Sequence, residues 1–133
     1  MRFFSVGGGG GSGSGTYYLT YAVGDETTAL TSGTAKLTFR MPFAMTLTGV
    51  RASVTTAPTG SDLTVDIYEG VSSVLSAVLT IDDGTKTSVG SASPAAISDA
   101  SLADDAEMTI DIVAVGSTVA GAGLKVTLIG TET

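Results

Sequence analysis

The heptapeptide AKLTFRM, residues 35–41, alternates apolar and polar side chains along its whole length. Leu37, Phe39 and Met41 fall on one side of an extended chain, and the intervening lysine, threonine and arginine fall on the other. Alternation with a period of two residues is the pattern of a β-strand that buries one of its faces. This stretch therefore predicts an antiparallel sheet with one face in a core and one face toward water.

The same pattern recurs along most of the chain after residue 15. The segment LTVDIYE, residues 63–69, places Leu63, Val65 and Ile67 on one face. We expect about eight short strands, covering residues 16–23, 35–41, 44–56, 63–69, 74–81, 85–90, 107–115 and 122–130. Many short strands separated by turn signals predict an all-β fold, and we expect an antiparallel β-sandwich of jelly-roll type. The inward positions are predicted to be Leu37, Phe39, Leu47, Val65, Ile67, Ile110, Ile112, Val126 and Leu128.

Turn and bulge signals divide these strands. Gly49 predicts a bulge inside its strand, and Gly60 supplies the positive φ that the APTGSD turn needs. The triplet DDG, residues 82–84, predicts a hairpin into residues 85–90. Residues 93–107 show neither strand nor sustained helical periodicity, and Asp99 is able to cap at most a single helical turn. We expect this irregular segment to cross from one sheet to the other.

Composition excludes several classes of function. The chain has a formal net charge of −7, so it lacks the basic footprint that nucleic-acid binding requires. It contains no cysteine and no histidine, which removes disulfides, thiolate metal sites and the commonest general base. No apolar stretch approaches the roughly 18 residues of a membrane span. We therefore expect no cofactor, no nucleic acid and no membrane partner.

The beginning of the chain differs from the rest. Seven of the nine residues 7–15 are glycine, and the other two are serine, which is the composition of a flexible linker. We therefore divide the chain into an N-terminal arm, residues 1–15, and a β-sandwich domain, residues 16–133. The hexapeptide MRFFSV at the start of the arm is too short for a signal peptide and is interpreted as a partner-binding segment. Its candidate contact residues are Met1, Arg2, Phe3, Phe4 and Val6.

Acidic and aromatic residues offer weaker signals. Carboxylates gather in three places: Asp62, Asp66 and Glu69; Asp82 and Asp83; and Asp99, Asp104, Asp105, Glu107 and Asp111. We favour turn and surface roles for them over a weak calcium site, and paired catalytic carboxylates are less favoured still. Tyr17 and Tyr18 fall on opposite faces of one strand, so packing is favoured over a sugar-stacking platform. No catalytic residue and no metal ligand is assigned, and an enzyme is not expected.

Three stretches carry a resemblance to a known class of protein: VGDETTALTSGTAKLTFRMPFAMTLTGVRASVTTAPTGSDLTVDIYEG, ISDASLADDAEMTIDI and GAGLKVTLIGT. Across roughly residues 22–131 the chain resembles a small β-sandwich module of tailed-phage virion proteins. Such modules occur at tail-fibre ends and as short head or fibre proteins. The resemblance implies no catalytic residues, and the lack of a shaft favours a small decoration or head-fibre protein over a long tail fibre.

The resemblance and the arm together predict a virion structural protein. We expect a capsid decoration (cement) or head-fibre protein, anchored by its arm to the major capsid protein or to another virion protein. We also expect a homo-oligomer, with a trimer as the first expectation. The alternative is a receptor- or glycan-binding tip domain of a tail fibre. A polysaccharide-degrading enzyme would need two carboxylates that face each other across a groove.

Overall fold

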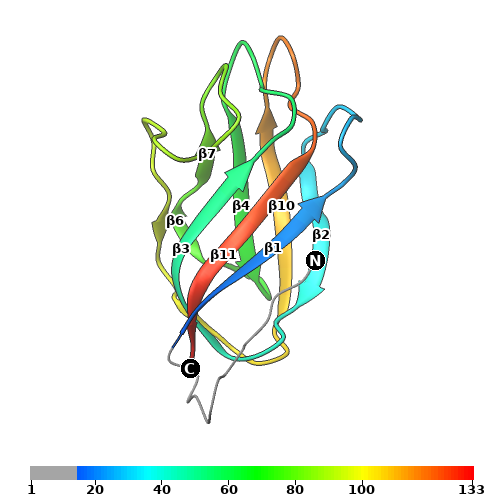
Figure 1. The fold of residues 1–133 in the computed structure, drawn as a ribbon. Coiled ribbons are helices and arrows are strands. Elements are labelled where there is room, and N and C mark those ends of the chain that lie inside the picture. Colours follow the sequence, from blue (N-terminus) through cyan, green and yellow to red (C-terminus); the bar gives the residue numbers. More distant parts are fainter. Residues whose placement is uncertain (1–14) are drawn as a thin grey trace.

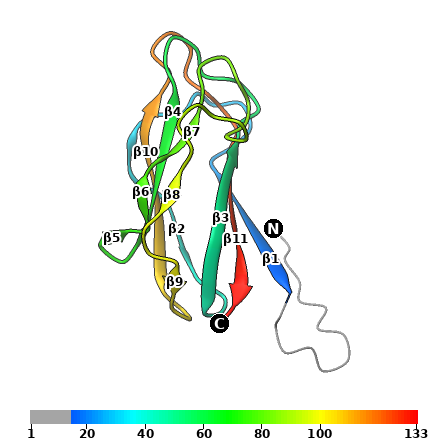
Figure 2. The ribbon, with the colours of Figure 1, turned by 90° about the vertical axis from the view of Figure 1, so that its left-hand side faces the viewer.

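A computed structural model describes residues 15–133 of the chain, and this part is built from antiparallel β-strands without a helix. Two sheets pack face to face, as the edge-on view in Figure 2 shows. The strands are β1 (Thr16–Val23), β2 (Gly33–Arg40), β3 (Met45–Ser53), β4 (Leu63–Glu69), β5 (Ser72–Ser73), β6 (Leu75–Ala77), β7 (Leu79–Ile81), β8 (Ala96–Ile97), β9 (Ser101–Leu102), β10 (Glu107–Val115) and β11 (Leu124–Glu132). The predicted all-β, two-sheet architecture is confirmed.

The order of the strands follows a nested pattern. One sheet, here called sheet A, has the order β1-β11-β3-β9. The other, sheet C, has the order β2-β10-β4-β5, and β7 also pairs with β4. The first long strand therefore pairs with the last, the second with the last but one, and the third with β9. The last two strands lie inside the sheets, between strands from the first half of the chain (Figure 1).

The core lies between the two sheets and follows the alternation seen in the sequence. Seven of the nine predicted inward residues are at most 3% exposed: Leu47, Val65, Ile67, Ile110, Ile112, Val126 and Leu128. The remaining two, Leu37 and Phe39, are only partly buried, although they pack against the core. Both belong to β2, which is an edge strand of sheet C and has a neighbouring strand on one side only.

Three expectations for the middle of the chain are wrong. Residues 85–90 form no strand; Thr87 makes only an isolated bridge to Ser53 of β3. The predicted strand 74–81 is divided into two short strands. β6 pairs with β8 in a separate two-stranded sheet, and β7 pairs with β4 of sheet C. The DDG turn does not return the chain to its own sheet, because the backbone after it bonds to β3: the amide of Val54 donates to the carbonyl of Lys86 at 2.9 Å. The crossing between sheets thus begins earlier than the predicted residues 93–107.

Two glycines on β3 and β11 mark a bulge in sheet A. The register shifts at this point, where Ile129 pairs with Gly49 but Gly130 pairs with Leu47, which confirms the bulge predicted at Gly49. A Cβ on Gly130 would overlap the backbone carbonyl of Thr46, so the close approach of these strands requires glycine there. At Gly49 an added Cβ would lie 3.7 Å from the Cδ1 atom of Ile129, an ordinary contact.

We predict that Ile110→Ala lowers the free energy of unfolding by about 2–5 kcal/mol. Ile110 is fully buried on β10, between β2 and β4, so the truncation leaves a cavity in the centre of sheet C. Urea unfolding followed by circular dichroism measures the change. The matched control is Val113→Ala on the same strand, where the side chain is 56% exposed and the expected change is within about 0.5 kcal/mol. Equal losses in the two variants would contradict the predicted packing.

Candidate functional site

The arm leaves the domain from the end where the C-terminus also lies. Thr16 at the start of β1 pairs with Thr131 near the end of β11, so both termini of the described chain lie at the lower end of the sandwich (Figure 1). The five candidate contact residues of the arm, Met1, Arg2, Phe3, Phe4 and Val6, lie outside the described residues 15–133. The structure instead defines the surfaces beside the point where the arm begins.

An aromatic edge joins the two sheets on one side of the sandwich. It is formed by β1 and β2, which are both edge strands. The rings of Tyr21 and Phe39 stack with centroids 3.8 Å apart, and those of Tyr17 and Phe43 lie 5.0 Å apart in a tilted arrangement. Burial raises the pKa of Tyr21 above its ordinary value. Tyr17 and Tyr21 thus serve packing between the sheets, which the sequence predicted for Tyr17, whereas Tyr18 is 60% exposed and does not belong to the core.

The loops at the opposite, upper end are joined to one another. The amide of Leu30 donates to the carbonyl of Gly121, and the amide of Thr55 donates to the carbonyl of Ala122, each at 2.9 Å. These bonds link connections that are far apart in sequence and leave little freedom to any one of them. The connections that meet here are residues 24–32, 54–62, 82–86 and 116–123.

An ion pair reinforces the same end. The carboxylate of Glu26 contacts the ammonium group of Lys125 on β11, and it also accepts a hydrogen bond from the hydroxyl of Thr55 at 2.6 Å. Two hydrogen bonds lower the pKa of Glu26 below its ordinary value: the bond from Lys125 has the larger effect and the bond from Thr55 the next largest. Because the acid is exposed, the pair is a positioning contact more than a source of stability.

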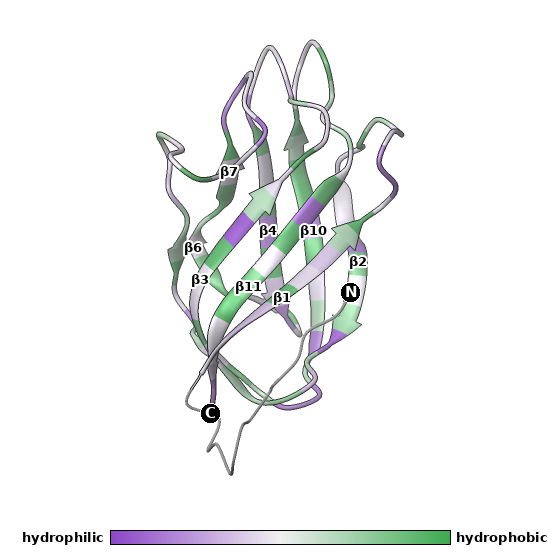
Figure 3. Cartoon of the chain, in the orientation of Figure 1, coloured by the Kyte–Doolittle hydropathy of each residue, from purple (hydrophilic) through white to green (hydrophobic). Residues whose placement is uncertain are grey.

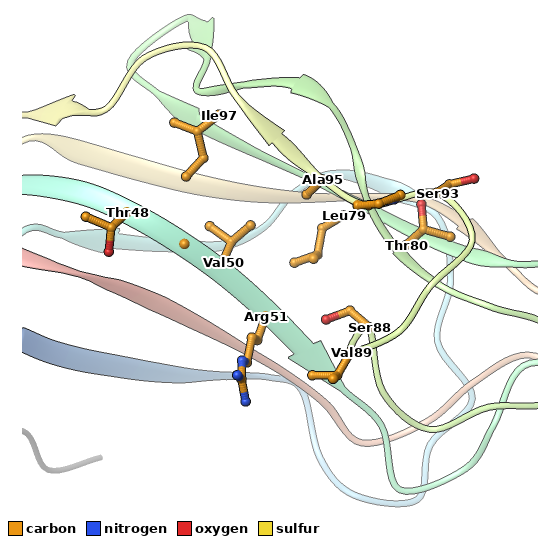
Figure 4. A pocket seen from close by; sticks show the side chains of 12 residues that line it. Thr48, Val50, Arg51, Leu79, Thr80, Ser88, Val89, Ser93, Ala95 and Ile97 are labelled. Carbon is orange, nitrogen blue, oxygen red and sulfur yellow. The ribbon is translucent and has the colours of Figure 1, made fainter.

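A groove of about 470 Å³ lies on the side of the sandwich away from the aromatic edge (Figure 4). It opens between β3, β7 and the crossing segment 88–97. The groove exists because β9 covers only the first two residues of β3, and the chain returns to this strand at Ala52, whose backbone exchanges bonds with Ser88. Arg51 is the one charged residue of its lining, among hydroxyl and small apolar side chains. The alternation in the sequence does not predict this groove, because the groove depends on which part of β3 has no neighbouring strand.

The first acidic cluster is not a cluster in space. Its three carboxylates accept hydrogen bonds from three different segments, which is a structural role for each of them. Asp62 accepts from the amide of Asp83, Asp66 from the hydroxyl of Ser73, and Glu69 from the amide of Ala103. The predicted turn and surface roles of these residues are confirmed.

Asp82 fixes the start of the crossing between the sheets. Its carboxylate accepts from the hydroxyl of Ser91 at 2.6 Å and from the amide of Ala92 at 2.9 Å. These two bonds lower the pKa of Asp82 below its ordinary value of 3.8. Its neighbour Asp83 accepts from the amide of Gly60 at 3.1 Å and so connects two turns.

One pair of carboxylates from different clusters does meet. Asp66 and Asp111 lie opposite each other on β4 and β10, on the outer face of sheet C. The Asp66 charge, together with desolvation and the Asp111 charge, raises the pKa of the adjacent Tyr68. Asp111 also accepts from the amide of Ala35 at 2.7 Å, which holds that residue at its positive φ of 48°. Asp111 therefore has a backbone-supporting role.

The remaining acids of the third cluster lie in turns or at strand ends. Asp99 accepts from the amide of Ser101 at 3.1 Å, so it caps a turn and not a helix. Within residues 15–133 no three acidic side chains are placed to hold a metal ion together. The same part of the chain contains no helix long and apolar enough to cross a membrane.

Comparison with known proteins adds no relative: no family model, no curated protein and no solved structure matches the chain.

We predict that acid destabilises the domain partly through Asp82. A carboxyl whose pKa is lower in the folded state stabilises the fold above its ordinary pKa of 3.8, and this contribution is lost as the pH falls below that value. Asp82→Asn is therefore expected to lower the melting temperature at pH 7 and to reduce its further fall between pH 5 and pH 3. The control is Asp104→Asn, an exposed acid of the turn before β10. An unchanged acid profile in Asp82→Asn would contradict this role.

We predict that the domain keeps its melting temperature when divalent cations are removed. Several of its acidic side chains, such as Asp62 and Asp82, already accept hydrogen bonds from the protein. Differential scanning calorimetry with EDTA and with added Ca²⁺ makes the comparison, and Asp66→Asn identifies the site if the two scans differ. A clear fall on chelation would show that carboxylates of this chain bind calcium.

Proposed function

We propose that the chain is a structural protein of a phage particle, a capsid decoration or head-fibre protein held by its N-terminal arm. The observation that carries this proposal is the position of the arm. Thr16, where the arm joins the domain, lies at the lower end of the edge strand β1 and beside the C-terminus, while the hydrogen-bonded loops lie at the other end (Figure 1). A domain tethered there presents its loop end away from whatever the arm binds.

A jelly-roll topology of the domain forms part of the proposal. A jelly roll is a double sheet of eight strands that combines two Greek keys. The nested pairs β1 with β11, β2 with β10, β3 with β9 and β4 with β7 supply eight of the strands of the two sheets, and β5 is an additional short strand of sheet C. Double-sheet jelly rolls are common in viral capsid proteins, which agrees with a virion role.

The energetics of the arm favour a partner that offers backbone hydrogen bonds. Ordering fifteen residues costs on the order of 15–30 kcal/mol of backbone entropy at the extreme. Burial of Phe3 and Phe4 returns only about 1.5–3 kcal/mol for each ring. Strand addition to a partner sheet would supply the missing interactions, and the glycines would let the arm pass close to another backbone. The partner is proposed to be the major capsid protein or another virion protein.

A receptor- or glycan-binding tip domain is the second candidate. The groove beside β3 favours it, because Arg51 and several hydroxyl-bearing residues line it together with small apolar side chains (Figure 4). A saccharide presents a matching combination of apolar and hydroxyl surfaces. The two candidates differ in the surface that is used: a decoration protein needs the arm, whereas a tip domain needs the groove or the loops.

We predict that Phe3→Ala combined with Phe4→Ala abolishes binding to the parent particle but leaves the melting temperature unchanged. Both rings belong to the arm, which precedes the sandwich core (residues 16–133). Co-sedimentation with particles stripped of this protein measures binding, and deletion of residues 1–14 is expected to have the same effect. The matched control is Val71→Ala with Val113→Ala, which removes two exposed apolar side chains from the domain itself.

Two outcomes would contradict the anchoring role. Full binding by the Phe3 and Phe4 variant would exclude the arm as the anchor. A much lower melting temperature would show that the arm belongs to the fold. If Arg51→Ala abolishes binding to cell-surface glycans while the arm variant has no defect, the tip-domain alternative is favoured.

A further inference from the structure

The outer face of sheet A has an unusual composition. Its outward residues come from β1, β11 and β3; six of the thirteen are threonine, and the others are one each of tyrosine, isoleucine, alanine, glycine, serine, arginine and lysine. We call this surface the threonine face; it consists of Thr16, Tyr18, Thr20, Ala22, Thr46, Thr48, Gly49, Arg51, Ser53, Lys125, Thr127, Ile129 and Thr131. In Figure 3 strong purple appears on these strands only in short bands. None of these outward residues is acidic, although the chain has a net charge of −7.

The outer face of sheet C has the opposite character. It carries two bases and three acids from β2, β4 and β10, and these charges are suited to contact with water. They are Lys36, Arg40, Asp66, Glu107 and Asp111. The difference between the faces bears on self-association, because two acidic copies repel each other except where their contact surfaces lack negative charge. The threonine face meets this condition, and the outer face of sheet C does not.

One row of the threonine face has a self-complementary shape. Tyr18 pairs with Ile129, and Ile129 pairs with Gly49, so the three residues lie side by side across β1, β11 and β3. Tyr18 is 60% exposed and forms a projection at one end of the row. Gly49, at the other end, has no side chain that projects from the face. Ile129 provides an apolar centre between them, with its Cδ1 atom close to Gly49.

We infer that two copies of this chain pack through their threonine faces about a two-fold axis that runs parallel to β11 above Ile129. Neighbouring strands are about 4.8 Å apart, so Tyr18 and Gly49 lie at equal distances on either side of Ile129. A two-fold axis at Ile129 therefore places Tyr18 of each copy over Gly49 of the other. In such an interface each residue pair occurs twice, once in each direction.

The adjacent rows are compatible with this arrangement. The hydroxyls of Thr20 and Thr127 already bond to each other at 2.9 Å, so little polar surface is left unpaired when water is excluded. The axis places Thr20 of one copy opposite Arg51 of the other. The two Lys125 side chains approach the axis, but the carboxylate of Glu26 in the same copy neutralises each of them.

The size of the face predicts a weak association. Three strands of about eight residues cover roughly 14 by 26 Å, or about 400 Å² on each copy. Stable interfaces bury about 800 Å² on each partner, so the pair is expected to form at high micromolar concentration and above. The inference does not depend on the anchoring role of the arm. It differs from the trimer expected from the sequence, because an isologous contact closes at two copies.

Sedimentation equilibrium of the full chain, up to about 1 mM, tests the inference. We expect a monomer–dimer equilibrium, with the association constant reduced at least about tenfold by Tyr18→Asp and by Gly49→Lys. Tyr18 is exposed, and an added Cβ at Gly49 would make only an ordinary contact with Ile129, so the fold is expected to persist, which circular dichroism checks. The control is Val113→Lys, which adds a charge at a similarly exposed position on the outer face of sheet C.

A charge-pair experiment tests the axis itself. In a mixture of the Tyr18→Asp and Gly49→Lys variants, one copy supplies the acid and the other the base at the proposed contact. The mixture should associate more strongly than either variant alone. A chain that stays monomeric at 1 mM, a trimer, or equal losses in Val113→Lys and Tyr18→Asp would overturn the inference. If the unchanged chain shows no self-association but Tyr18→Asp loses particle binding, the threonine face contacts the particle and the inference is overturned. The anchoring role of the arm is tested separately by Phe3→Ala combined with Phe4→Ala.

Discussion

The fold depends on the insertion of the last two long strands into sheets begun by the first half of the chain. β11 pairs with β1 on one side and with β3 on the other, and β10 pairs in the same way with β2 and β4. Neither sheet is continuous without its inserted strand, because β1 does not pair with β3 and β2 does not pair with β4. Sheet A thus forms only when segments about 100–115 residues apart meet, and sheet C when segments about 70–80 residues apart meet, which makes folding cooperative and slow relative to local hairpins.

This topology also determines where the exposed strand edges lie. β1 and β2 are left as long edges on one side, and stacked rings such as Tyr21 and Phe39 close the gap between the sheets there. On the other side the edges are short, and the crossing segment covers them incompletely, which leaves the groove beside β3. Exposed edges invite pairing with other chains. The long edge strand β1, which directly follows the arm in the sequence, is therefore a surface suited to added strands.

The sequence predicted which residues are inward better than it predicted which strands are neighbours. A period of two places Ile67 and Ile110 in the core whatever the order of the strands, and both are fully buried. It places Leu37 inward equally well, yet it gives no sign that β2 lies at an edge. The expected hairpin after DDG is not present. The carboxylate of Asp82 accepts hydrogen bonds from the hydroxyl of Ser91 and the amide of Ala92, and these bonds direct the chain toward the other sheet. Such side-chain bonds are invisible to periodicity.

The candidate surfaces could not be predicted from the sequence for the same reason: they depend on which strands are neighbours. Tyr18, Ile129 and Gly49 are far apart in the chain, and only the register of β1, β11 and β3 brings them into one row. A weak contact through this row and a stronger contact through the arm are compatible, since the face is formed by β1, β11 and β3, whereas the arm consists of the residues before Thr16. Anchoring many copies on one particle would raise their local concentration, so a contact too weak to pair free chains becomes occupied after attachment. Weak self-association would then prevent premature assembly in solution, which a large apolar face would promote.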